Sequence, residues 1–296
     1  MRAEMKDSGR TRLLDMHAHL SCFMGENGPG LRDEERQALA EQELELRRSS
    51  RVASFFSCGG LEEWEFMRKY RNREEVFLSF AIHPWNTGFP DHAEGGRRED
   101  TLYEERSREE AMRDAFAECD AVGETGMDSV WCDVPLSLQR RSFERQLQIA
   151  ADLKKPVILH TKGMEREIAA MIRDFSEPVC VHWYSGDRES FEAFLEADCF
   201  FTLGPDLAEA YEKNALYRLM LREIPVSRLF VETDGISSIA WARGVREAEL
   251  SEIPEVLAGN VDFIAEMKNM RREELRGRMW ENLREFFRKT GTEARL

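Results

Sequence analysis

The 296-residue sequence contains no apolar run that approaches the roughly 20 residues needed to span a bilayer. Its first residues, MRAEMKDSGRTR, are polar and lack the apolar core of a secretory signal, so we expect residues 1–11 to form a flexible tail. The six cysteines include no Cys-x-x-Cys pair, which excludes the usual spacing of zinc ribbons and thioredoxin-type sites. Scattered cysteines favour a reducing compartment, and we therefore predict a cytoplasmic protein without membrane attachment.

Basic residues are outnumbered: 42 Lys and Arg stand against 57 Asp and Glu, giving a net charge of -15. This deficit argues against a large basic surface for duplex nucleic acid. It does not exclude an enzyme acting on nucleic acid, because bound cations can invert the local field of an acidic site. The length suits one α/β barrel, so we predict a single domain over residues 12–296. No obligate protein partner can be read from the sequence.

Eight short runs rich in β-branched and aromatic residues alternate with amphipathic segments. The expected strands are Leu13–His17, Val52–Ser57, Phe77–His83, Ala121–Glu124, Val157–His160, Val179–His182, Cys199–Leu203 and Leu229–Asp234. The expected helices are Glu34–Arg48, Leu61–Tyr70, Thr101–Cys119, Leu136–Leu153, Met164–Phe175, Arg188–Ala197 and Leu207–Glu223, with two more within Pro254–Met267 and Glu273–Arg288. The alternation predicts parallel strands, because parallel neighbours need crossover connections. A closed (β/α)₈ TIM barrel and an open doubly wound sheet both fit it.

Histidines and carboxylates gather at the C-terminal ends of these strands. They are His17, His19, His83, His160 and His182, together with Glu124 and Asp234. A closed ring brings the first and last strands together around one mouth, so these positions favour the TIM barrel. Imidazoles and carboxylates suit divalent metal ions, and such ions suit hydrolysis. We therefore predict a metal site at the C-terminal ends of the barrel strands.

Each of these residues also has a purely structural explanation. His17 and His19, which share one face of a strand, could simply form a polar strand end. Glu124 could interact with a helix N-terminus, and Asp234 could be a turn residue before a glycine. His160 and His182 could be hydrogen-bonded core residues. Their recurrence at several strand ends favours metal binding, and Asp234 could also accept a proton from water.

Six segments in order carry a resemblance to the TatD family of metal-dependent deoxyribonucleases, within the amidohydrolase superfamily. They are LDMHAHL, AIHPWN, AVGETGMD, PVILHTKG, VHWYSGD and LFVETDGIS, and the late segment MWENLREFF, with Asn282, resembles that family's closing helix. The resemblance implies a barrel that holds two divalent ions, with zinc, manganese, cobalt, nickel and magnesium as candidates. One ion would be held by His17, His19, Glu124 and Asp234 and the other by Glu124, His160 and His182, with Glu124 bridging.

Residues near these positions suggest how a substrate is held. The resemblance makes His83 a site residue but not a metal ligand. Lys162 stands where the family commonly has arginine, and lysine contacts phosphate as a point charge rather than through two parallel hydrogen bonds. Trp85, Trp183 and Tyr184 follow strand ends and could stack on a nucleobase, although aromatic residues there more often pack the loops. We expect the charged runs EERQALAEQELELRRSSR and REEAMRDAFAE to form solvated helix faces.

Three functions remain open. The first is a two-metal phosphodiesterase that cleaves single-stranded DNA or a small phosphoester, with Asp234 as the base. The second is a hydrolase of a non-phosphate ester, lactone or amide, which is kept open by Lys162 and by Gly235-Ile236-Ser237 in place of the family's usual Ser-Pro. The third is a catalytically silent binding or scaffold protein, against which the complete set of ligands argues.

Overall fold

The computed structural model describes residues 12–24, 30–87 and 110–288 of the chain. Residues 1–11 lie outside these ranges, as does most of the two loops Met24–Leu31 and Asn86–Asp100 that the sequence places after the first and third strands. Within the described ranges, no helix is both long enough and apolar enough to cross a membrane.

All eight predicted strands are present and form one sheet in chain order. Their bounds are β1 Leu13–Ala18, β2 Val52–Cys58, β3 Val76–Phe80, β4 Ala121–Gly126, β5 Val157–His160, β6 Val179–Val181, β7 Phe200–Leu203 and β8 Leu229–Val231. The strands from β3 to β7 pair in parallel. β3 and β8 end three residues before His83 and Asp234, so these two side chains extend from loops rather than from strands.

Backbone hydrogen bonds join the first and last strands and so close the ring. The Asp234 amide donates to the His17 carbonyl at 3.0 Å, and the Glu232 amide donates to the Leu203 carbonyl at 3.1 Å. On the other side of β1, the Leu13 amide donates to the Arg51 carbonyl at 3.0 Å. The fold is therefore the predicted (β/α)₈ TIM barrel.

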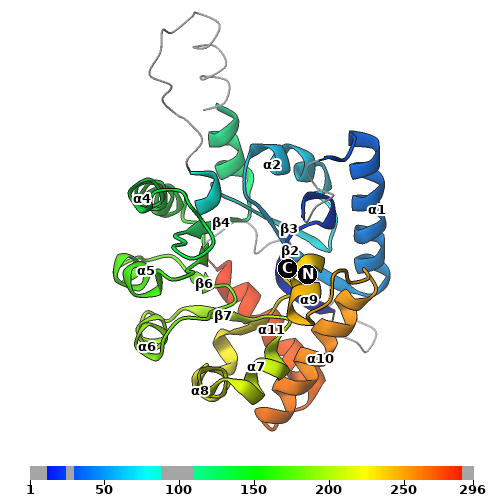
Figure 1. Ribbon diagram of the computed structural model, residues 1–296, viewed down its shortest axis with the longest axis vertical. Helices are drawn as coiled ribbons and strands as arrows, with labels where there is room; N and C mark the ends of the chain where they lie inside the picture. The colour runs from blue at the N-terminus through cyan, green and yellow to red at the C-terminus, as the bar shows by residue number, and fades with distance from the viewer. Residues whose placement is uncertain (1–11, 25–29, 88–109, 289–296) are drawn as a thin grey trace, which may run out of the picture. The chain divides into compact units, whose positions relative to one another are not determined.

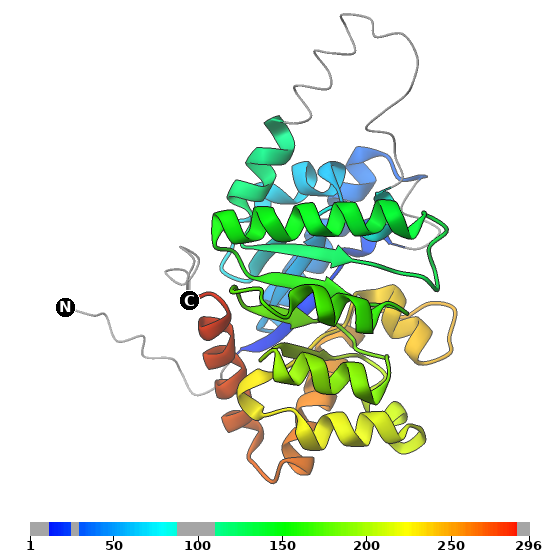
Figure 2. The same ribbon diagram turned by 90° about the vertical axis from the view of Figure 1, so that its left-hand side faces the viewer.

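The chain contains two compact units, and the prediction of a single domain stays a prediction. One unit comprises residues 55–202 and 286–296 and carries most of β2 to β7. Its helices are α2 Leu61–Met67, a helix over 110–118, α4 Leu136–Leu153, α5 Glu165–Ile172 and α6 Arg188–Glu196, with 3-10 turns at Arg68–Tyr70 and Pro84–Asn86. Figure 1 shows α4, α5 and α6 in succession outside their strands, and Figure 2 shows α4 alongside β4.

The other unit comprises residues 1–54 and 203–285 and carries β1 and β8. Its helices are α1 Asp33–Ser49, α7 Leu207–Lys213, α8 Ala215–Glu223, α9 Ile236–Ala242, α10 Glu252–Met267 and nearly all of α11 Arg272–Phe286, with 3-10 turns at Ser21–Phe23 and Val226–Arg228. The single helix predicted over Leu207–Glu223 is in fact two, because Asn214 adopts an extended conformation and caps α8 by accepting from the Leu216 amide. Asn282 of α11 donates to the carbonyls of Val226 and Leu229, which fixes the start of β8.

Candidate functional site

In the unit that comprises residues 1–54 and 203–285, three predicted ligands lie together, and we call them the first-strand group: His17, His19 and Asp234. The Asp234 Oδ1 atom lies 3.2 Å from His17 Nε2 and 3.6 Å from His19 Nε2. His17 lies in β1 and His19 one residue beyond its end, and both imidazoles are directed at Asp234, as their spacing predicts. His17 is fully buried, whereas His19 and Asp234 are partly accessible, so the group opens to solvent on one side.

The turn after β8 fixes the Asp234 carboxylate. Asp234 has a φ of 55° and Gly235 a φ of 90°, a left-handed stretch that directs the chain into α9. A Cβ atom on Gly235 would lie 2.9 Å from the His19 carbonyl oxygen, so only glycine fits this close approach to β1. Ser238 of α9 donates to Asp234 Oδ2 at 2.8 Å, which leaves Oδ1 directed at the two imidazoles.

A buried charge network supports the first-strand group. Asp15, two residues before His17, accepts from the backbone amide and the hydroxyl of Thr233 at 2.8 and 2.7 Å. Arg47 of α1 donates to Asp15 at 2.7 Å and forms an ion pair with Glu43 at 2.9 Å. Burial raises the pKa of Asp15, and the charge and hydrogen bonds of Arg47 oppose that rise. The network therefore ties the residue beside Asp234 to β1, the strand that carries His17.

This network corrects the prediction that the charged run of α1 is a solvated face. Arg47 is fully buried and Glu43 is only 1% exposed. The Glu43 carboxylate also accepts from the Ser21 amide at 2.9 Å, just after His19. A helix with many charges can still bury the few that face a polar strand, because each of them finds a charged partner there.

In the unit that comprises residues 55–202 and 286–296, three imidazoles converge on one carboxylate oxygen, and we call these residues the Glu124 group: Glu124, His83, His160 and His182. Glu124 Oε1 lies 2.5 Å from His160 Nδ1, 2.9 Å from His182 Nε2 and 3.6 Å from His83 Nε2. The Glu124 side chain is only 3% exposed. The structure thus brings together the predicted ligands in β4, in β5 and directly after β6, and it places His83 beside them.

Asp128 is a site residue that the sequence analysis missed, although it ends the quoted segment AVGETGMD. Its Oδ2 atom accepts from the Trp85 indole at 2.8 Å and lies 3.0 Å from His160 Nε2. Burial raises the pKa of Asp128, but the hydrogen bonds from His160, the Trp131 amide and Trp85 outweigh it, so the pKa is lowered. Burial lowers the pKa of His160, but the nearby Glu124 and Asp128 carboxylates reverse this, so the pKa is raised.

Tight packing at the end of β4 places Asp128 opposite His160. Gly126 has a φ of 149°, and a Cβ atom there would overlap the His160 carbonyl oxygen. The Met127 amide donates to that same carbonyl at 3.2 Å. Gln139 of α4 then accepts from the Asp128 amide at 2.7 Å and donates to the Asp128 carbonyl at 3.0 Å. Strand β5 and helix α4 together therefore set the position of the missed carboxylate.

The predicted substrate residues have different environments. Lys162 donates to the Ser185 hydroxyl at 2.9 Å, and its ammonium lies 4.4 Å from the centre of the Trp131 ring. Trp85 is 47% exposed, so part of its ring is open to a ligand. Trp183 is partly exposed, and its backbone amide donates to Thr202.

The prediction of base stacking is wrong for Tyr184. This side chain is 1% exposed and packs against the rings of Phe191, Phe194 and Phe201. Its hydroxyl donates to the Asp187 carbonyl at 2.5 Å. A ring enclosed on its faces has no surface for a base, so Tyr184 packs the loop instead.

Both groups fit divalent metal ions by the chemistry of their donors. The ligand atoms of His17, His19 and Asp234 lie within 4.8 Å of one another, and those of His83, Glu124 and His160 do likewise. Imidazole nitrogens and carboxylate oxygens without a thiolate suit zinc, manganese, cobalt or nickel. The carboxylates around His160 also provide the hydrogen-bonding partners that orient a ligating imidazole.

Comparison with known proteins agrees with this architecture. The human protein named 3'-5' RNA nuclease TATDN2 is 33% identical over 175 residues, which are 58% of this chain but only 21% of the human protein. The Escherichia coli K12 protein named uncharacterized metal-dependent hydrolase YcfH is 26% identical over 206 residues, 69% of this chain and 70% of its own length.

Solved structures share the fold. The crystal structure of YJJV, a TatD homologue from Escherichia coli K12, superposes with a TM-score of 0.70 over 94% of this chain and 98% of that one, at 19% identity. The family model described as TatD related DNase matches residues 14–288, which include both histidine–carboxylate groups. The chain therefore belongs to the TatD-related DNase family.

Proposed function

We propose that this metal-dependent hydrolase cleaves phosphodiester bonds in single-stranded nucleic acid, using two divalent ions. The observation that carries the proposal is a pair of histidine–carboxylate clusters. The ligand atoms of His17, His19 and Asp234 lie within 4.8 Å of one another. Glu124 Oε1 lies 2.5 Å from His160 Nδ1 and 2.9 Å from His182 Nε2. When bound, such ions supply Lewis-acid activation of water and of the phosphoryl oxygen. His17, His19 and Asp234 would hold one ion, and Glu124, His160 and His182 the other. The bridging role of Glu124 stays a prediction.

The contacts of Asp234 support its proposed role as the base. Its Oδ1 atom faces the imidazoles of His17 and His19, while Oδ2 accepts from Ser238 at 2.8 Å. A carboxylate held by a hydroxyl keeps a fixed orientation, so it can accept a proton from an attacking water without first reorganising. His83 lies 3.6 Å from Glu124, and we propose that it contacts the substrate or orients Glu124 rather than binding an ion.

The proposed substrate class rests on the family and on the positively charged side chain of Lys162. The family model is described as a DNase and the human relative as an RNA nuclease, so either sugar is possible. Lys162 lies after β5 and presents a partly exposed ammonium that suits a phosphate. We propose single-stranded DNA first, with a small phosphoester or RNA as the alternative. A non-phosphate ester, lactone or amide remains the competing substrate class.

We also propose a cytoplasmic location, which the six free cysteines fit.

The test compares substrates with the full chain and Mn²⁺. We expect cleavage of labelled single-stranded oligonucleotides and no turnover of lactones. Asp234→Asn should lower kcat by about 10²–10⁴-fold, the usual loss for a general base. Asp152→Asn, an exposed change in α4, is the control and should leave the rate unchanged. Turnover of lactones alone would favour the competing class, and no turnover of any substrate would favour a silent scaffold protein.

A further inference from the structure

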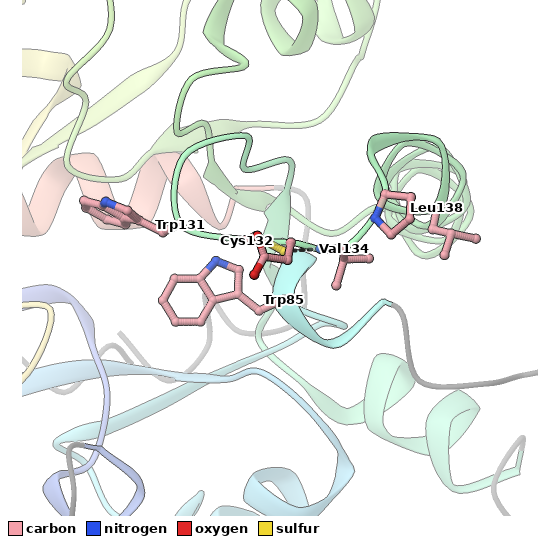
Figure 3. A pocket seen from close by; sticks show the side chains of 7 residues that line it. Trp85, Trp131, Cys132, Val134 and Leu138 are labelled. Carbon is pink, nitrogen blue, oxygen red and sulfur yellow. Dashed lines mark hydrogen bonds between the residues drawn. The ribbon is translucent and has the colours of Figure 1, made fainter.

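A pocket opens beside the Glu124 group, and its walls are mainly apolar. Its volume is about 510 Å³, and it is lined by Trp85, Trp131, Cys132, Asp133, Val134, Pro135 and Leu138. Figure 3 shows the two indoles at one end of this lining and Val134 with Leu138 at the other. Trp131 is 57% exposed and Trp85 is 47% exposed, which is unusual for side chains that prefer burial.

The pocket is built by the same contacts that hold the metal-binding residues. Asp128 accepts from the Trp131 amide at 2.8 Å through Oδ1 and from the Trp85 indole at 2.8 Å through Oδ2. That Oδ2 atom also lies 3.0 Å from His160. Gln139 donates to the Val134 carbonyl at 2.8 Å, which fixes the far side of the loop. The Trp85 indole and the Trp131 backbone are therefore both tied, through Asp128, to the predicted metal ligand His160.

A cation lies at the aromatic wall. The Lys162 ammonium is 4.4 Å from the Trp131 ring centre. The ammonium lies over one face of that ring, and Lys162 also donates a hydrogen bond of 2.9 Å to the Ser185 hydroxyl, which holds the ammonium in place. Aromatic faces next to a positive charge provide the two contacts that a nucleotide needs, one for the base and one for its phosphate.

We propose that this pocket binds an unpaired nucleobase of the substrate strand, next to the phosphodiester that is cleaved. The base stacks on the exposed indoles of Trp131 and Trp85 against the apolar wall of Val134 and Leu138, and Lys162 contacts the adjoining phosphate. A base in a duplex has both faces covered by its neighbours, so the pocket selects single strands. The proposal deepens the proposed function and rests on it.

The experiment measures binding separately from cleavage. Two fluorescent oligonucleotides of equal length, oligothymidylate and its abasic counterpart, are titrated into the full chain in EDTA and followed by anisotropy. We expect the chain to bind the oligothymidylate about tenfold more tightly, as stacking on aromatic side chains predicts. Trp131→Ala and Leu138→Ala should remove this preference, and Trp131→Phe should keep most of it. An oligoribothymidylate arm, which keeps the base and changes only the sugar, reports whether the sugar also matters.

Controls separate the pocket from the rest of the protein. Leu153→Ala alters an exposed leucine at the opposite end of α4 and should leave the tenfold preference unchanged. Equal affinity of the native chain for both oligonucleotides, absence of binding to either, or a preference that survives Trp131→Ala would overturn the inference. Cleavage with Mn²⁺ is measured in parallel. If the chain prefers oligothymidylate to the abasic oligonucleotide but hydrolyses no phosphodiester, the proposed function is refuted and the inference about the pocket stands.

Discussion

The first-strand group and the Glu124 group contain the same types of side chain, but different contacts hold them. Asp234 is positioned by its backbone turn and by a buried network, in which Asp15 joins Arg47 to Thr233. In the Glu124 group, His160 is held directly between two carboxylates, those of Glu124 and of the adjacent Asp128. The comparison shows that a predicted ligand can be positioned by its own turn and a buried charge network, or by hydrogen bonds between the site side chains themselves. Binding of an ion to His160 would have to replace at least one of these bonds.

The largest expected effect comes from breaking the buried network. Arg47→Met leaves Asp15 and Glu43 buried without their cation, and we expect the free energy of unfolding to fall by about 3–5 kcal/mol. Urea denaturation measures it. The matched control is Arg48→Met, which removes the neighbouring but exposed arginine paired with Glu45 and should cost at most about 1 kcal/mol. Similar losses in the two variants would show that the network does not support the first-strand group.

A smaller effect should follow at Asp128, which contacts His160 of the Glu124 group. Asp128→Asn removes the charge opposite His160 while keeping the side chain's size, and we expect Mn²⁺ affinity to fall about 10–100-fold with little loss of stability. Calorimetric titration gives the affinity. Asp174→Asn, at an exposed position, is the control. Unchanged Mn²⁺ binding in Asp128→Asn would remove this residue from the support of the site.

The smallest expected effect is a change in the rate at which cysteine thiols are alkylated. It reports on the pocket beside the Glu124 group, because Cys132 lines that pocket. Cys132 is partly exposed, whereas Cys22, Cys58, Cys119, Cys180 and Cys199 are buried. Burial raises the pKa of Cys119 to about 11, so this thiol stays protonated at pH 8. We expect iodoacetamide to modify Cys132 first, and oligothymidylate to slow that reaction. Mass spectrometry of the peptides checks this, and modification of the buried thiols at the same rate would contradict the packing described.

Much of the fold could be predicted from hydrophobic periodicity, because each strand is a short apolar run between turn residues. Helix α4 has the predicted bounds of Leu136–Leu153. The seven-residue helix α9 was missed, since so short a segment shows little periodicity. The break at Asn214 was also missed, because a residue that caps the next helix can equally occur within one.

The site was predictable where a residue ends a strand, and less so where a loop places it. The sequence places His160 at the end of its strand and Glu124 close to the end of the observed β4, and both positions follow from the pattern of β-branched residues. Asp128 lies two residues beyond β4, and only the contacts made by Gly126 and Gln139 turn it toward His160. Arg47 looked like one more surface charge, because sequence alone does not show which member of a charged run faces a strand.

The most direct test of the account is the number of ions that the chain binds. Mn²⁺ is titrated into the EDTA-treated and dialysed protein by calorimetry, for the native chain and for His17→Ala and His160→Ala, one from each group. We expect two ions per native chain and the loss of one tight site in each variant. A native chain that binds fewer than two ions, or variants that both keep two tight sites, would contradict the assignment of the two groups as metal sites.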